Sequence, residues 1–143
     1  MSPLYAATLV AHVLVAVLGL GTMTAIGLGA AVARRGGLSW TESASWFRPL
    51  LRCSVASLAA MLLSGLLLDL LARGAFHGFW WFRGSVILLF ATGAVHGQAR
   101  RALRLGSASE DRPDPWVSRI EYSAYGMCVL IGAITMLMEL KPF

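Results

Sequence analysis

Four apolar runs, separated by polar segments, divide the chain at residues 4–33, 50–72, 79–99 and 116–140. Each run is long enough to cross the hydrocarbon core of a bilayer as a helix, which takes about 20 residues. No run alternates between apolar and polar residues, which argues against strands. Because backbone groups in lipid must be paired within their own segment, the pattern predicts an all-α fold, an integral membrane four-helix bundle.

Composition supports this fold class and a single membrane domain over residues 1–143. Hydrophobic residues make up 57% of the chain and charged residues 13%, whereas a water-soluble domain carries about 25% charged residues. The predicted surroundings of the helices are therefore the lipid bilayer.

Basic residues gather at alternate ends of the apolar runs, which predicts an orientation. Around the first and third interruptions of the apolar pattern lie Arg34, Arg35, Arg48, Arg52, Arg100, Arg101, Arg104, Arg112 and Arg119. The opposite side carries Arg73, Arg83 and Lys141. By the positive-inside rule, residues 34–49 and 100–115 are cytoplasmic loops, and both termini lie outside, in the periplasm of a bacterium with this protein in its inner membrane. The net charge of +5 follows this topology and predicts no nucleic-acid partner.

Polar and small residues recur at helical spacing on three runs and predict a partly polar bundle interior. On the second run these are Ser54, Ser57, Met61, Ser64 and Gly65, on the third Ser85, Thr92 and His96, and on the fourth Glu121, Tyr125, Cys128, Gly132, Thr135 and Glu139. Polar groups that face lipid are costly, so these faces are expected to point inward. They would hold a cofactor or form an ordinary interhelical hydrogen-bond network.

The first run also carries small residues at every fourth position: Gly21, Ala25, Gly29 and Ala33. Such a stripe lets another helix backbone approach closely. It serves either packing within the bundle or an interface with a second copy or a membrane-complex partner.

Two histidines inside the runs are candidate ligands, because ionisable residues within a membrane are functional candidates. His12 lies in the first half of its helix and His96 near the end of the third. Parallel helices then place them at levels that differ by roughly 10 to 15 Å, so one haem or metal ion is not ligated by both. The alternative reading is a hydrogen-bonded core residue for His12 and an interfacial residue for His96.

Methionines add soft ligands to these histidines. Met23 lies on the same helix face as His12, and Met61, Met136 and Met138 are further thioethers suited to Cu(I). The acidic and basic residues near the ends of the runs are expected to form ion pairs. Those singled out are Asp69, Arg83, Glu121 and Glu139, with Glu139 pairing with Arg73 or Arg83 and Glu121 lying near Arg48, Arg52 or Arg100.

Several short motifs resemble a known superfamily. They are AHVLVAVLGLG in the first run, FWWFRG opening the third, AVHGQARR near its end, and the final KPF. This order is similar to the small four-helix membrane proteins that include the CopD copper-resistance domain and the HemJ-type protoporphyrinogen oxidases. The resemblance implies that His12 is the helix-one histidine associated with haem b and that His96 is the histidine late in helix three. The lysine expected after the tryptophans is Arg83 here.

Two functional classes follow from these features. The first is a redox or metal-handling protein that binds haem b or copper in the bundle, which as an enzyme would be a haem-dependent membrane oxidoreductase. The second is a non-enzymatic membrane subunit or assembly factor without a cofactor, in which the histidines and charges only pack and pair. No nucleophile–base pair, phosphate loop or acid dyad is evident.

Overall fold

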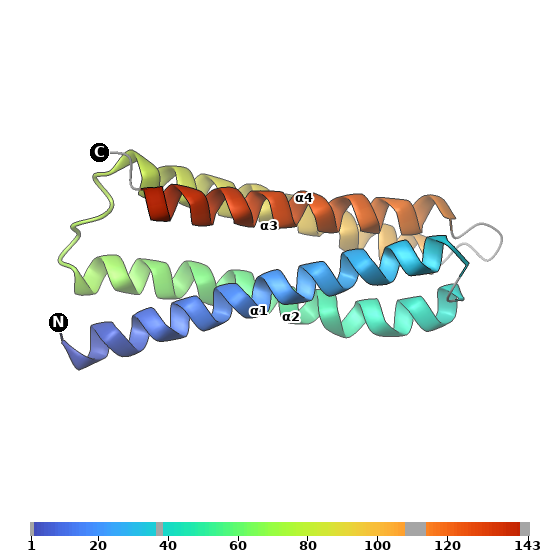
Figure 1. Ribbon diagram of the computed structural model, residues 1–143, viewed down its shortest axis with the longest axis horizontal. Helices are drawn as coiled ribbons and strands as arrows, with labels where there is room; N and C mark the ends of the chain where they lie inside the picture. The colour runs from blue at the N-terminus through green and yellow to red at the C-terminus, as the bar shows by residue number, and fades with distance from the viewer. Residues whose placement is uncertain (1, 37–38, 108–113, 141–143) are drawn as a thin grey trace.

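The computed structural model describes residues 2–36, 39–107 and 114–140, and within these ranges the chain forms four helices. They are α1 (Pro3–Arg34), α2 (Trp40–Leu71), α3 (Trp80–Gly106) and α4 (Asp114–Leu140). The all-α fold predicted from the apolar runs is confirmed. The helices run antiparallel in sequence order, so that α1 begins and α4 ends at the same end of an elongated bundle (Figure 1). We call this the terminal end and the opposite one the arginine end.

Local signals explain where the first two helices begin. The Ser2 side chain accepts a hydrogen bond from the backbone N–H of Tyr5, and Pro3 occupies the first turn of α1, where its missing donor costs nothing. The α2 helix starts with a reciprocal capping box between Ser39 and Glu42. These contacts satisfy backbone donors that the first turn of a helix leaves free.

The four helices form a bundle in which each packs against two neighbours. The α1 helix packs against α2 and α4, and α3 packs against α4 and, less extensively, against α2. Within the described residues, the backbones of the diagonal pairs, α1 with α3 and α2 with α4, do not approach within 8 Å of each other. The α2–α3 seam is therefore the most loosely packed of the four.

The packed core lies mainly toward the arginine end. Its fully buried members include Met23, Ile26, Phe47, Ile120 and Met127. On α4 the buried apolar face is Val117, Ile120, Ala124, Met127, Ile131 and Ile134, in alternating steps of three and four. This spacing keeps one stripe of a helix against its neighbours.

The inward polar face predicted for α4 is largely wrong. Only Glu121 of that set is buried, whereas Tyr125, Gly132, Thr135 and Glu139 are exposed. The apolar stripe one position earlier is the one that packs, since each residue turns a helix by about 100°. The predictions for α2 and α3 fare better, because Ser54, Met61, Ser85, Thr92 and His96 are all buried.

Three helices are long and apolar enough to cross a membrane: α1, α2 from Thr41, and α4 from Pro115. Their outward faces are apolar as well, with Val17 at 64% and Leu63 at 67% exposure. Such surfaces suit lipid contact. Among the described helices, α3 does not meet the same criterion of length and hydropathy. Its apolar stretch is short, because it is limited by Arg83 on one side and by His96 on the other. Of the four spans expected from the sequence, the structure therefore supports three by this criterion.

Two expected helix boundaries differ from the structure. The α2 helix begins at Trp40 instead of residue 50 and continues through Pro49, and α3 continues to Gly106 instead of ending at 99. The segments expected to be loops are thus partly helical. A proline inside a helix costs about 3 kcal/mol, which the upstream capping box and the buried Phe47 side chain help to offset.

The small-residue stripe of α1 divides between two environments. A Cβ built on Gly29 would lie 3.2 Å from a ring carbon of Phe47 on α2, whereas Gly21 has nothing within 4 Å and Ala25 is exposed. Close approach to α4 occurs instead at Gly27, where a Cβ would lie 3.4 Å from that of Ala124. Part of the stripe thus packs inside the bundle, and Gly21 and Ala25 remain on the surface.

Candidate functional site

The His12 side chain makes one interhelical hydrogen bond, to Ser64 on α2. Its Nδ1 lies 2.8 Å from Ser64 Oγ. The Ser64 hydroxyl donates its only proton to backbone carbonyls of its own helix, at 2.6 Å from the oxygen of Ala60 and 3.3 Å from that of Met61. With that proton engaged, the hydrogen-bond pattern assigns Ser64 Oγ as the acceptor from His12 and the imidazole proton to Nδ1. The Nε2 atom keeps its lone pair.

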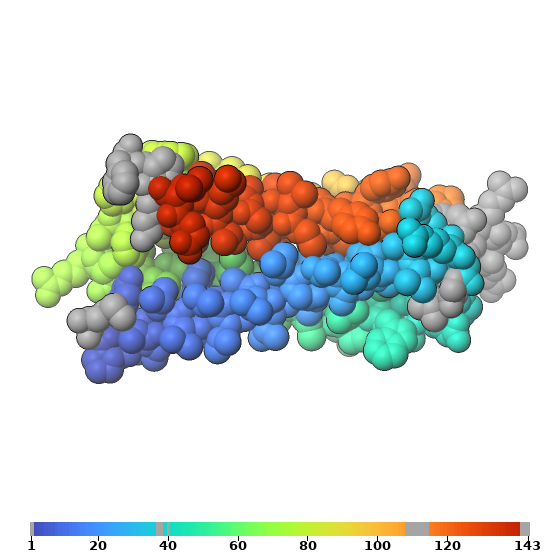
Figure 2. All heavy atoms as spheres, in the orientation of Figure 1, coloured from blue at the N-terminus to red at the C-terminus, as the bar shows by residue number. Residues whose placement is uncertain are grey.

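His12 lines a small cavity in the half of the bundle nearest the terminal end, and all four helices contribute to its walls. The surface is hollowed there between the first half of α1 and the last part of α4, with α2 visible behind (Figure 2). The lining residues are His12, Met61, Leu62, Gly65, Leu66, Phe82, Ser85, Val86, Leu89, Ile134 and Met138. Among these apolar walls the imidazole, two thioethers and one hydroxyl are the groups able to bind a ligand. The Ser85 Oγ is buried and has no hydrogen-bond partner among the described residues.

The size of this cavity limits what it holds. Its volume is about 30 Å³, which is enough for a water molecule or a bare metal ion. Ligand pockets for organic molecules occupy roughly 300 to 1,000 Å³, so the bundle as packed has no room for a haem macrocycle beside His12. Imidazole and thioether ligands together favour a soft ion such as Cu(I). No group of three His, Cys, Asp or Glu side chains in the described parts of the chain is arranged to hold a metal.

His96 belongs to a different level of the bundle. Its Nε2 donates to the backbone carbonyl of Leu51 at 3.1 Å, and the side chain is buried. Leu51 and Ser64, the partners of the two histidines, are 13 residues apart on α2, or about 20 Å along a helix axis. One bound group therefore does not reach both histidines, in line with the prediction that they lie at different depths.

Met23 also lies away from His12. It is fully buried in the apolar core beside Ile26 and Phe47 and does not line the His12 cavity. Eleven residues of α1 separate it from His12, which is about 16 Å of rise. The structure thus brings Met61 and Met138, rather than Met23, to the same cavity as His12.

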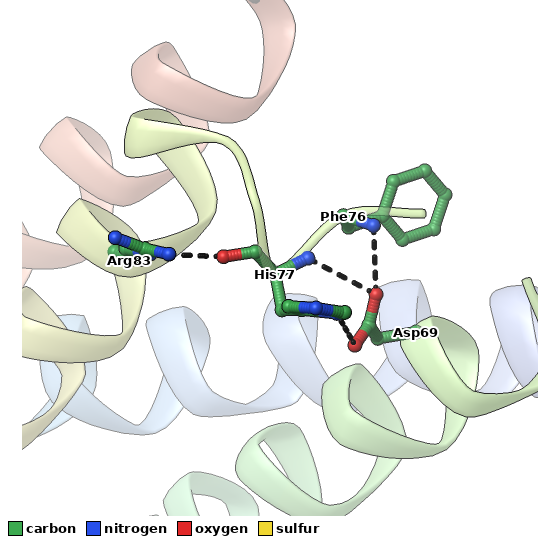
Figure 3. Close-up of polar contacts among 4 residues, drawn as sticks. All are labelled: Asp69, Phe76, His77 and Arg83. Carbon is green, nitrogen blue, oxygen red and sulfur yellow. Dashed lines mark hydrogen bonds and ion pairs between the residues drawn. The ribbon is translucent and has the colours of Figure 1, made fainter. Parts of the chain in front are cut away.

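Asp69 organises the connection between α2 and α3 (Figure 3). Its Oδ1 accepts hydrogen bonds from the backbone N–H groups of Phe76 at 2.8 Å and His77 at 3.2 Å, and its Oδ2 lies 3.3 Å from His77 Nδ1. The Arg83 Nε donates to the His77 carbonyl at 2.9 Å. Asp69 and Arg83 therefore anchor one loop from its two sides. All of these contacts lie within the α2–α3 connection, and a structural role accounts for each of them.

The other two charged candidates behave differently. Glu121 pairs with Arg34, which was not among its predicted partners, instead of Arg48, Arg52 or Arg100. Glu139 is exposed and forms no ion pair within the described part of the chain. Arg73 and Arg83 are therefore not its partners, and Lys141 lies outside the described residues. Exposed charges at a helix end need no partner, because water solvates them.

Comparison of the chain with protein-family models, with curated proteins and with solved structures finds no match. The resemblance to the CopD and HemJ-type superfamily stays a prediction from sequence motifs.

Proposed function

We propose that this chain is a metal-handling protein of the bacterial inner membrane, and that it binds one Cu(I) ion in the His12 cavity. The proposed ligands are His12 Nε2 and the thioethers of Met61 and Met138. Both termini face the periplasm, and the arginine end faces the cytoplasm, where lysine and arginine are retained.

The observation that carries the proposal is the hydrogen bond between His12 Nδ1 and Ser64 Oγ. A metal-binding histidine commonly donates its other ring N–H to a second group, which orients the ring and frees the ligating nitrogen. Ser64 provides that acceptor at 2.8 Å. Two methionines line the same cavity, and Cu(I) accepts such soft, uncharged ligands without requiring a carboxylate.

The low polarity of the cavity also favours a monovalent ion. Placing a doubly charged ion among apolar side chains without a counter-charge costs much more solvation energy than placing a singly charged one. Cu(I) would therefore be preferred over Zn²⁺, which has no acidic or thiolate ligand in the set that lines the cavity. With a cavity this small, the ion is bound directly by protein groups.

The test is an anaerobic titration of the detergent-purified protein with Cu(I) in competition with a chromogenic Cu(I) chelator. We expect one tightly held copper per chain, and X-ray absorption should report both nitrogen and sulfur neighbours. His12→Ala should abolish this binding, and Met61→Leu or Met138→Leu should weaken it at least tenfold. Leucine keeps the approximate volume of methionine and removes the sulfur.

Two methionines provide matched controls. Met127 is as buried as Met61 but belongs to the core, and Met136 is exposed. Leucine at either position should leave copper affinity unchanged. Equal copper binding by the wild type and His12→Ala would refute the proposal, as would a loss of affinity in Met127→Leu as large as that in Met61→Leu. A visible spectrum with a Soret band would instead establish haem binding.

A further inference from the structure

Four arginines from two helices line one hollow at the arginine end. Arg48 and Arg52 come from α2, and Arg100 and Arg104 come from α3. Leu51, Leu103 and Ser107 complete the lining, and the open volume is about 510 Å³. Each pair is spaced four residues apart, so both side chains of a pair project from the same face of their helix.

These positive charges are not neutralised by any carboxylate whose side chain the structure describes. Glu42 is bound by Ser39, and Glu121 is paired with Arg34. Asp69 and Glu139 lie at the terminal end of the bundle. Like charges at this spacing destabilise a helix, and four of them around one hollow create a strongly positive field. An anion bound in the hollow would relieve that repulsion.

An apolar groove along the α2–α3 seam adjoins this hollow. Its lining residues include Leu58, Leu62, Phe90, Gly93, Gly97 and Arg100. Arg100 lines both the hollow and the groove, so the two meet at its side chain. The groove exists because α2 and α3 have the least extensive contact among neighbouring helices and because two glycines of α3 leave space beside it.

We propose that the hollow and the groove together bind one anionic phospholipid, with its phosphate at the four arginines and an acyl chain along the α2–α3 seam. The planar guanidinium group matches the oxygens of a phosphate and donates to two of them at once. Basic pockets between membrane helices on the cytoplasmic side are suited to acidic headgroups. The apolar groove selects a lipid over free phosphate, because a free anion gains nothing from it.

The glycines of the groove allow a test that leaves the arginines untouched. A Cβ built on Gly93 or Gly97 would meet nothing within 4 Å, and the same holds for Gly132 on α4, which lies outside the groove. A leucine at Gly93 would start from an open position on the wall of the groove and reduce the space within it. Gly132→Leu is therefore the matched control, because it makes the same substitution at an equally open helical glycine outside the groove.

The experiment is native mass spectrometry of the detergent-purified full chain titrated with phosphatidylglycerol or phosphatidylcholine. We expect phosphatidylglycerol to bind at least tenfold more tightly than phosphatidylcholine. The double variant Arg52→Gln/Arg100→Gln should remove that preference. The control double variant Arg35→Gln/Arg73→Gln, with the same change in net charge, should keep it.

The groove is tested separately. Gly93→Leu should weaken phosphatidylglycerol binding at least fivefold and Gly132→Leu should not. Circular dichroism and thermal melting identify any variant that fails to fold, and the comparison is made among the folded ones.

Three outcomes would overturn the proposal. The first is equal binding of the two lipids by the wild type. The second is an equal effect of the two double-arginine variants. The third is loss of binding in the arginine variant with none in Gly93→Leu, together with displacement of the lipid by millimolar inorganic phosphate, because that pattern describes a site for free anions.

Discussion

Arg34, in the last turn of α1, forms an ion pair with Glu121 of α4. Glu121 is buried, with only 5% of its surface exposed. The Arg34 Nε lies 2.8 Å from Oε2, and its Nη2 donates to Oε1 at 3.3 Å. The pair joins two helices across 87 positions of sequence. It also places a positive group at a helix C-terminus, where it is favourable.

The two partners of this pair should respond unequally to mutation. Arg34→Gln leaves a buried carboxylate without its counter-charge, whereas Glu121→Gln leaves a half-exposed arginine that water can solvate. We expect Arg34→Gln to destabilise the protein by about 1–2 kcal/mol more than Glu121→Gln does. Thermal or denaturant unfolding in detergent measures this difference, with Arg35→Gln as the control for charge. Equal losses would show that the pair does not bury a net charge.

The close approach of α1 to α4 predicts a contrast between two glycines of α1. Gly27→Leu places a large side chain against Ala124, where even a Cβ would be in contact, while Gly21→Leu extends into open space. Overpacking costs about 1–3 kcal/mol, whereas leucine at an exposed helical glycine gains up to about 1 kcal/mol. The two variants should therefore shift the melting temperature in opposite directions. A similar shift in both would contradict this packing.

The Asp69 contacts predict how the α2–α3 connection loosens. Asp69→Ala removes the acceptor for the backbone N–H groups of Phe76 and His77, at a cost of about 1–2 kcal/mol. Hydrogen exchange at these two amides should accelerate in Asp69→Ala and much less in Asp69→Asn, whose side-chain oxygen still accepts. His77→Ala keeps both backbone bonds and serves as the control. Unchanged protection in Asp69→Ala would count against the anchoring role.

The hydrogen bond between Ser64 and His12 predicts a tautomer that can be measured. Nitrogen-detected magnetic resonance should find the His12 proton on Nδ1 in the wild type and a mixture of tautomers in Ser64→Ala. If the proposed copper site is correct, Ser64→Ala should also lower Cu(I) affinity about 10- to 100-fold, as loss of an orienting hydrogen bond does. Ser57→Ala, on the same helix but not lining the cavity, should change neither quantity. A proton on Nε2 in the wild type would remove the main argument for the site.

Several parts of the fold follow from local sequence. The apolar runs predicted the helices, and the polar positions of the second and third runs correctly placed Ser54, Met61, Ser85 and His96 inside the bundle. The capping box of Ser39 and Glu42 was also present in the sequence as an S-x-x-E pattern. This pattern indicates a helix start near Ser39, about ten residues before the apolar run that begins at residue 50.

Other features could not be derived from spacing. On α4 two stripes, one polar and one apolar, lie about 100° apart, and both have helical periodicity. The neighbouring helices decide which stripe is buried, and the periodicity alone does not. The choice of Arg34 over three other arginines as the partner of Glu121 has the same origin, because it depends on how α1 and α4 meet.

The sequence by itself determined the helices, their apolar outer surfaces and the concentration of arginines at one end, since these depend on composition and on residues near one another along the chain. Only the tertiary structure decided which side chain is hydrogen-bonded to His12, which methionines share its cavity, and that arginines of α2 and α3 surround one hollow. Those relationships join residues that are tens of positions apart. They are fixed by the rotation and packing of whole helices, which no local pattern encodes.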